Sequence, residues 1–105
     1  MFPKGGMSGI YKKAQEMQKK MADIQSEINL MEVEGLSGGD MVKAIVNGEK
    51  KVLSLNLNPD ILNEDKEMLE DLILVAINQA IEKVDTISKE KMGSLTGGMN
   101  IPGLF

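Results

Sequence analysis

Four lysines near the start of the chain repeat at an interval of seven residues, as Lys12, Lys13, Lys19 and Lys20. In an α-helix, residues seven apart lie on the same side, so these lysines would form a basic stripe beside Gln15 and Gln18. Lysine binds phosphate as a point charge, and glutamine can add hydrogen bonds to a nucleic-acid backbone or groove. The stripe therefore suits phosphate contact, although a solvated helix face has the same pattern. Lys4, in a glycine-rich arm, could also reach a phosphate backbone or simply belong to a solvated end.

Most other kinds of chemistry lack the side chains they need. The chain has no histidine and no cysteine, which are the commonest acid–base, nucleophilic and metal-binding groups. The carboxylates that follow Asp60 do not make a calcium loop, because Leu62 stands at a ligand position and the turn glycine is missing. A phosphate-binding loop signature is absent, and a tight turn with positive φ is the expected use of Gly35, Gly38 and Gly39. We expect no catalytic residues, no metal site, no cofactor and no small-molecule substrate.

Charge is distributed unevenly along the chain. The net charge is −4, which by itself opposes nucleic-acid binding. Residues 1–22, however, hold five lysines against one glutamate, a net charge of +4, whereas residues 59–85 hold two lysines against eight carboxylates, a net charge of −6. All twelve basic residues are lysine, without the arginine fork that recognises guanine. The sequence predicts a basic end, an acidic middle and little base-specific recognition.

The first predicted helix covers about residues 9–32, with Ser8 as its N-cap. Apolar residues follow one another at alternating intervals of four and three, which is typical of a coiled-coil-like seam, at Ile10, Ala14, Met17, Met21, Ile24, Ile28 and Met31. Methionine at this spacing indicates packing rather than a binding surface. A helix of this length would extend roughly 36 Å, so part of it should project from so small a domain.

A β-hairpin is predicted around Asn47-Gly48, between strands at 41–46 and 52–57. Its parity places one set of residues on the core side of the sheet, namely Val42, Ala44 and Val46 with Leu53, Leu55 and Leu57. The opposite face is more apolar than a solvated face should be, since it holds Met41, Ile45 and Val52. We interpret these three residues as a first indication of a subunit contact.

The second predicted helix covers about residues 65–92, with Asn63 or Asp65 as its N-cap and Gly93 at its end. Residues 72–77 are apolar all around the helix, so one side should meet a partner, and the candidates are Leu72, Ile73, Ala76 and Ile77. We expect one domain over residues 9–93, between a flexible arm at 1–8 and a flexible tail at 94–105. The apolar run of six residues is too short to span a membrane, and no signal peptide is recognisable, so we expect a cytoplasmic protein.

Taken in order, several short segments resemble the YbaB/EbfC family over nearly the whole chain. They are Phe2 to Met7, Gln15 to Met21, Val33-Glu34-Gly35 with Gly38-Gly39, Val46-Asn47-Gly48, Asn58 to Leu62, Asp65 to Leu72, and Met92 to Gly98. The resemblance implies an α+β subunit of order α-β-β-β-α with a small antiparallel sheet between two long helices. It also implies a bacterial nucleoid-associated protein, a tweezer-like homodimer whose projecting helices bind double-stranded DNA. The family often carries basic residues on the third strand, where this chain has Leu53 and Ser54.

Two hypotheses remain at this stage. The first is a DNA-binding dimer in the nucleoid, with Lys4 and the basic stripe at the interface. The second is a protein-interaction clamp or adaptor that grips an apolar segment of a partner through Ile10, Met17 and Met21. Binding to plain duplex DNA at low and higher salt distinguishes the two.

Overall fold

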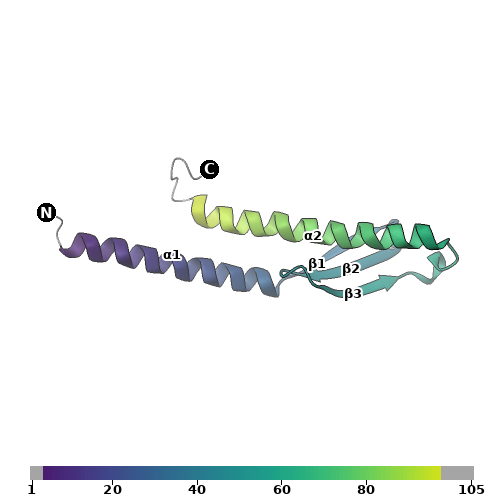
Figure 1. The fold of residues 1–105 in the computed structure, drawn as a ribbon, viewed down its shortest axis with the longest axis horizontal. Helices are drawn as coiled ribbons and strands as arrows, with labels where there is room; N and C mark the ends of the chain where they lie inside the picture. The colour runs from purple at the N-terminus through teal and green to yellow at the C-terminus, as the bar shows by residue number, and fades with distance from the viewer. Residues whose placement is uncertain (1–3, 98–105) are drawn as a thin grey trace.

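The computed structural model describes the backbone of residues 4–97 and the side chains of residues 9–95. The elements follow the order α1 (Lys4–Leu30), β1 (Glu32–Ser37), β2 (Val42–Asn47), β3 (Val52–Leu57), the 3-10 helix η1 (Pro59–Ile61) and α2 (Lys66–Gly97). The three strands form an antiparallel sheet in the order β1-β2-β3. This arrangement confirms the predicted α+β fold with two long helices (Figure 1). The molecule is a rod with extents of 76 × 25 × 16 Å.

Each helix extends beyond its predicted range at one end. Helix α1 begins at Lys4 rather than near residue 9, so Ser8 lies inside the helix and is not its N-cap. Helix α2 continues through Gly93 to Gly97. A single glycine costs a helix only about 1 kcal/mol, which neighbouring helix formers can offset. The predicted arm and tail thus overlap the two helices at residues 4–8 and 94–97, while residues 1–3 and 98–105 lie outside the described residues.

The predicted hairpin is present and its turn is ordered by one side chain. The Asn47 Oδ1 accepts hydrogen bonds from the backbone N–H groups of Glu49 (2.9 Å) and Lys51 (3.0 Å). Val42 pairs with Leu57, and Ala44 with Leu55, as the parity required. A β-bulge then shifts the register, so Val46 pairs with Val52 instead of Leu53. The sequence prediction placed Leu53 on the same face as Val46 and Val52 on the opposite face, and the bulge makes that parity wrong at the turn end of the hairpin.

The core lies between the sheet and one face of α2. Val42, Ala44 and Val46 are fully buried, and so are Ala76, Ala80 and Val84 on the helix. Helix α2 packs chiefly on β1 and β2. It approaches β1 so closely that a Cβ on Gly35 would overlap the carbonyl of Ala76, so this glycine serves close packing rather than a turn. The predicted positive φ occurs at Gly38 (59°) and Gly39 (69°), between β1 and β2.

Polar groups fix α2 along the β1 edge. The Ser37 hydroxyl donates to the Leu72 carbonyl (2.6 Å), and the Leu36 N–H donates to the Gln79 Oε1 (2.7 Å). Further along, the Lys83 Nζ donates to the Glu34 carbonyl (2.7 Å). These contacts hold the helix over β1 and β2, so the face of β3 on the same side of the sheet is left largely open.

Of the two predicted N-caps of α2, Asp65 is the one that the structure shows, because its Oδ1 accepts a hydrogen bond from the Met68 N–H at 2.8 Å. Loss of an N-cap side chain leaves an unpaired N–H group in the first helical turn. We expect Asp65→Ala to lower the free energy of unfolding by about 1 kcal/mol. Urea denaturation followed by circular dichroism measures this. Asp65→Asn, which retains a capping oxygen, should recover most of the loss, and equal losses in both variants would contradict the capping role.

Over the residues that the structure describes, neither of the two long helices combines the length with the apolar character that crossing a bilayer requires.

Candidate nucleic-acid interface

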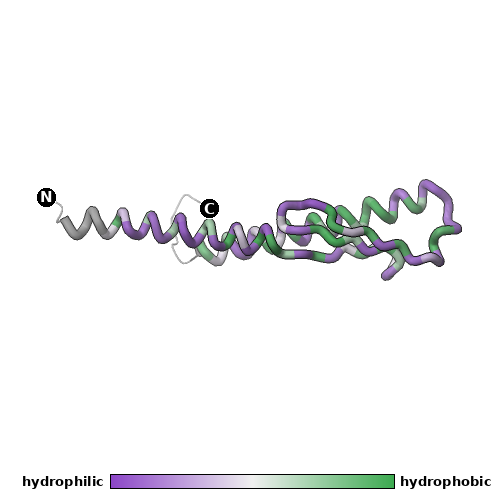
Figure 2. The backbone as a smooth tube through the Cα atoms, turned by 90° about the horizontal axis from the view of Figure 1, so that it is seen from below, coloured by the Kyte–Doolittle hydropathy of each residue, from purple (hydrophilic) through white to green (hydrophobic). Residues whose placement is uncertain are grey.

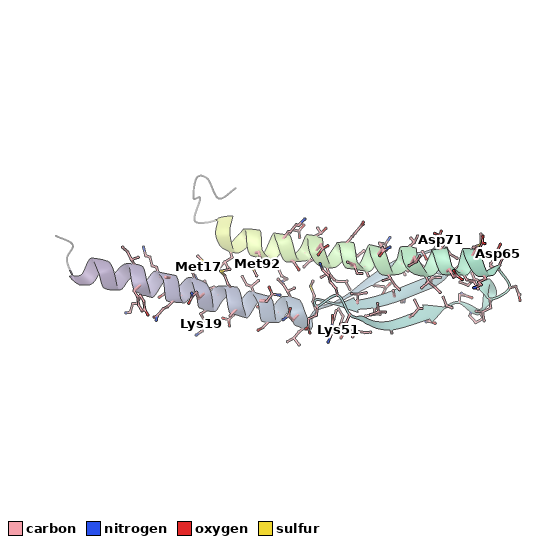
Figure 3. All side chains as sticks on the ribbon, in the orientation of Figure 1. Met17, Lys19, Lys51, Asp65, Asp71 and Met92 are labelled. Carbon is pink, nitrogen blue, oxygen red and sulfur yellow. The ribbon has the colours of Figure 1, made fainter. Side chains whose placement is uncertain are left out.

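Helix α1 is attached at its C-terminal end and extends past the end of α2 at its N-terminal end (Figure 1). The exposed fractions of the apolar seam residues show how much of α1 is packed against the rest of the subunit. Ile28, near the sheet, is 1% exposed, whereas Ile10 is 68% exposed. Between them, Met17 is half-buried and lies near Met92 of α2 (Figure 3). Figure 2 shows mostly hydrophilic residues, with a few hydrophobic ones between them, along the coloured length of α1 that extends beyond the sheet. The expected projection of α1 is therefore present.

The basic stripe lies on this projecting helix. All of its members are exposed, namely Lys12, Lys13, Gln15, Gln18, Lys19 and Lys20. Within the described side chains, none of the four lysines has a carboxylate within ion-pair distance, although Glu16 lies among them. Their ammonium groups are consequently available to an external anion. The Lys4 backbone begins α1, but its side chain lies outside the described residues.

The lysines do not all point the same way. Helix geometry places Lys12 and Lys19 about 180° from the apolar seam, while Lys13 and Lys20 flank it. The latter two line a shallow pocket of about 310 Å³ together with Glu16 and Met17. The stripe is therefore a broad cationic surface that could follow a phosphate backbone, rather than a closed pocket for a single anion.

The carboxylates of the acidic segment that begins at Asp60 lie in the other half of the rod. Asp65 and Asp71, in and before the first turns of α2, are at the end opposite the projecting part of α1, and Lys19 lies well away from them (Figure 3). The carboxylates of Asp60, Glu64, Asp65, Glu67, Glu70 and Asp71 all belong to exposed residues. The fold thus converts the uneven charge along the sequence into a separation in space.

The residues predicted to meet a partner occupy several environments. Ala76 is fully buried inside the subunit and has no surface left for another chain. Met41, Leu72, Ile73 and Ile77 are partly buried and pack against the core. Ile45 is half-buried, and Val52 is 46% exposed. Of the predicted interface residues, Val52 is therefore the one with the most side-chain surface open to a second subunit.

Sequence reasoning did not single out the two most exposed apolar side chains of the 72–77 segment. Leu74 is 58% exposed and Val75 45% exposed. Leu55 is 42% exposed, although it pairs with the fully buried Ala44. The apolar run at residues 72–77 predicted more hydrophobic surface than the sheet can cover. It did not indicate which of its residues would stay exposed.

Comparisons with known proteins agree with the sequence resemblance and the fold. The family model for the YbaB/EbfC DNA-binding family matches residues 4–99. A nucleoid-associated protein of Caldanaerobacter subterraneus subsp. tengcongensis is 45% identical over 106 residues, which cover 99% of this chain and 96% of that protein. The crystal structure of an uncharacterized Helicobacter pylori protein has the same fold, with a TM-score of 0.64, 22% identity, and coverage of 94% of this chain and 98% of that one. The chain therefore belongs to the YbaB/EbfC DNA-binding family.

Proposed function

We propose that this protein binds double-stranded DNA as a homodimer, through the lysines of its two α1 helices and with little sequence specificity. Its role would lie in nucleoid organisation or gene regulation, without catalysis, cofactor or small-molecule substrate. One observation carries the proposal, which is that four exposed lysines without ion-pair partners among the described residues occupy a helix that projects from the sheet. Membership of the YbaB/EbfC DNA-binding family and the similarity to a nucleoid-associated protein support it.

The net charge of −4 is compatible with this function because electrostatic interactions between exposed charges are short-ranged in salt. At physiological ionic strength, the Debye length is about 8 Å. The basic stripe and the acidic start of α2 lie in opposite halves of a molecule 76 Å long. A phosphate beside the lysines is therefore screened from most of the carboxylates, and the local charge decides the interaction.

Low sequence specificity follows from the types of side chain on α1. Lysine forms a salt link with a phosphate but lacks the planar fork with which arginine recognises guanine. Gln15 and Gln18 can donate hydrogen bonds, but the two glutamines of each stripe provide little base discrimination. We therefore expect similar affinities for unrelated duplexes of the same length.

A second copy of the chain would cover apolar surface that one subunit leaves open. We define the β3–α2 apolar surface as Leu55, Ile73, Leu74 and Ile77. Leu55 lies on the face of the sheet that bears α2, and Leu74 and Ile77 are three residues apart and so share one side of the helix. Strand β3 is also an edge strand of the sheet, with unpaired backbone groups. Pairing two copies here would bury this surface and present two α1 helices to one duplex.

The salt dependence of binding tests the proposed function. If about 4–6 phosphates are contacted per dimer, the slope of log K against log[salt] should be about −4 to −5. Fluorescence anisotropy with a labelled duplex at several salt concentrations between ~50 mM and ~200 mM measures it. Light scattering on the same sample should give the mass of two chains. Absence of binding at the lowest salt would rule out the proposal.

The alternative of a protein-interaction clamp keeps one specific observation in its favour. Ile10 and Met21, on the apolar seam, are 68% and 43% exposed, which is unusual for seam positions. In that case Ile10→Gln with Met21→Gln would abolish binding to the partner, and plain duplex DNA would not bind at either salt concentration. Retention of DNA binding in this double variant would support the lysine surface.

A further inference from the structure

The joint between α1 and the sheet contains an unusually close backbone contact. Helix α1 ends at Leu30 and β1 begins at Glu32, so the two elements are linked by Met31 alone. The tip of the β2–β3 hairpin lies against this joint. The Gly48 N–H donates to the Met31 carbonyl at 3.0 Å, and a Cβ on Gly48 would overlap the Ile28 carbonyl and lie 2.9 Å from the Asn29 nitrogen. Only a residue without a side chain fits here.

Gly48 is required for its size and not for its backbone conformation. Its φ lies outside the left-handed region, in contrast to Gly38 and Gly39. Alanine could therefore adopt the same backbone angles, and the cost of placing it there would be a steric clash with the last turn of α1. The turn cannot easily move away, because Asn47 holds it through two side-chain hydrogen bonds and the Asn47 N–H donates to the Lys51 carbonyl at 3.0 Å.

The other contacts at the joint are weaker. The Lys91 Nζ lies 3.8 Å from the Glu27 Oε2, and the Lys50 Nζ lies 2.7 Å from the Asp85 Oδ1. Both pairs are about half exposed, and ion pairs of this kind contribute little to stability. The Ile28 side chain, in the last turns of α1, is 1% exposed. Helix α1 also packs against α2. At its base, the backbone contact with Gly48 leaves no room for a side chain, so this contact constrains the direction in which α1 leaves the sheet.

We propose that Gly48 is a positioning residue for DNA binding, which sets the direction of α1. It acts at the C-terminal end of α1, far from the lysines near the other end of that helix. This inference rests on the proposed function of the basic stripe. A helix behaves as a stiff lever, and the sixteen residue-to-residue steps from Ile28 to Lys12 span about 24 Å. A tilt of about 10° at the joint would then move Lys12 by about 4 Å, enough to lose a direct phosphate contact. In a dimer, both helices would be misdirected.

The first test uses Gly48→Ala, with Gly93→Ala as a matched control because a Cβ at Gly93 meets nothing within 4 Å. The chain has no cysteine, so spin labels can be placed at Ala22→Cys on α1 and Asn63→Cys before α2, in labelled chains diluted with unlabelled ones. Double electron–electron resonance spectroscopy then reports the distance between the two spin labels within one chain. We expect Gly48→Ala to shift this distance and weaken DNA binding about tenfold or more, with circular dichroism and mass unchanged. Gly93→Ala should alter neither quantity.

A second variant protects the test against misfolding. Asn47→Ala keeps Gly48 but removes the two side-chain hydrogen bonds of the turn. We therefore expect a broader distribution of distances between the labels and a loss of a few fold in affinity for DNA. A folded Gly48→Ala protein with the wild-type distance and affinity would overturn the inference. If Gly48→Ala does not fold, an Asn47→Ala protein with wild-type values would overturn it. Failure of the wild-type protein to bind DNA would instead refute the proposed function and leave the distance measurement to judge the joint.

Discussion

Exchange of the four stripe lysines for glutamate is expected to abolish the retention of duplex DNA in a mobility-shift assay, with the protein still folded and dimeric. The exchanged residues are Lys12, Lys13, Lys19 and Lys20. Each exchange replaces an attraction to phosphate by a repulsion, and the counterion release that drives the association disappears. All four residues are exposed and, among the described side chains, none forms an ion pair. Surface changes of this kind usually alter stability by less than about 0.5 kcal/mol each.

A matched control separates the position of the charges from their number. It exchanges four lysines outside α1 for glutamate, at Lys43, Lys51, Lys66 and Lys89, and reaches the same net charge. We expect this variant to retain DNA with a modest loss of affinity, because three of the four changed charges, at Lys43, Lys51 and Lys66, lie away from the stripe and are screened by salt. Equal loss of binding in both variants would show that overall charge governs the interaction, and undiminished binding in the stripe variant would exclude α1 as the interface.

The parts of the fold that obey local rules could be predicted from the sequence. Asn47-Gly48 indicated the hairpin, the alternation at Val42, Ala44 and Val46 indicated the core face, and Asp65 was one of two predicted caps. The helix ends could not be predicted as well, because glycines within a helix are penalised by propensity but tolerated when the neighbouring turns are stable. Gly48 shows a related limit, since its type predicted the turn but not the contact with α1.

The candidate site also has features that local sequence predicts and features that depend on distant contacts. The exposure of the lysine stripe followed from helical periodicity, which depends only on neighbours in the sequence. The orientation of α2 did not, because the segment from Leu72 to Ile77 is apolar on every side and its periodicity favours no face. That orientation depends on contacts distant in sequence, such as the close approach of Gly35 to Ala76. Once α2 is fixed over β1 and β2, Leu55 and Leu74 are left exposed.

These two leucines carry the second large expected effect. Leu55→Glu combined with Leu74→Glu would place carboxylates in the β3–α2 apolar surface, where pairing of two copies would desolvate them without cationic partners. We expect the double variant to have the mass of one chain by light scattering. Because Leu55 and Leu74 are already 42% and 58% exposed in the subunit, the fold itself should persist, with a helical circular dichroism spectrum like that of the wild type.

Loss of the dimer should also weaken DNA binding, although both leucines are distant in sequence from the lysine stripe. A monomer presents one α1 helix instead of two, so the salt slope should fall to about half and the affinity at ~50 mM salt by at least about tenfold. Leu62→Glu is the control, since Leu62 is an exposed leucine outside the β3–α2 apolar surface, and it should leave both mass and affinity unchanged. A double variant that remains dimeric would place the interface elsewhere on the subunit. A monomeric variant that keeps the full salt slope would show that one α1 helix makes all the phosphate contacts, and the two-helix arrangement would have to be abandoned.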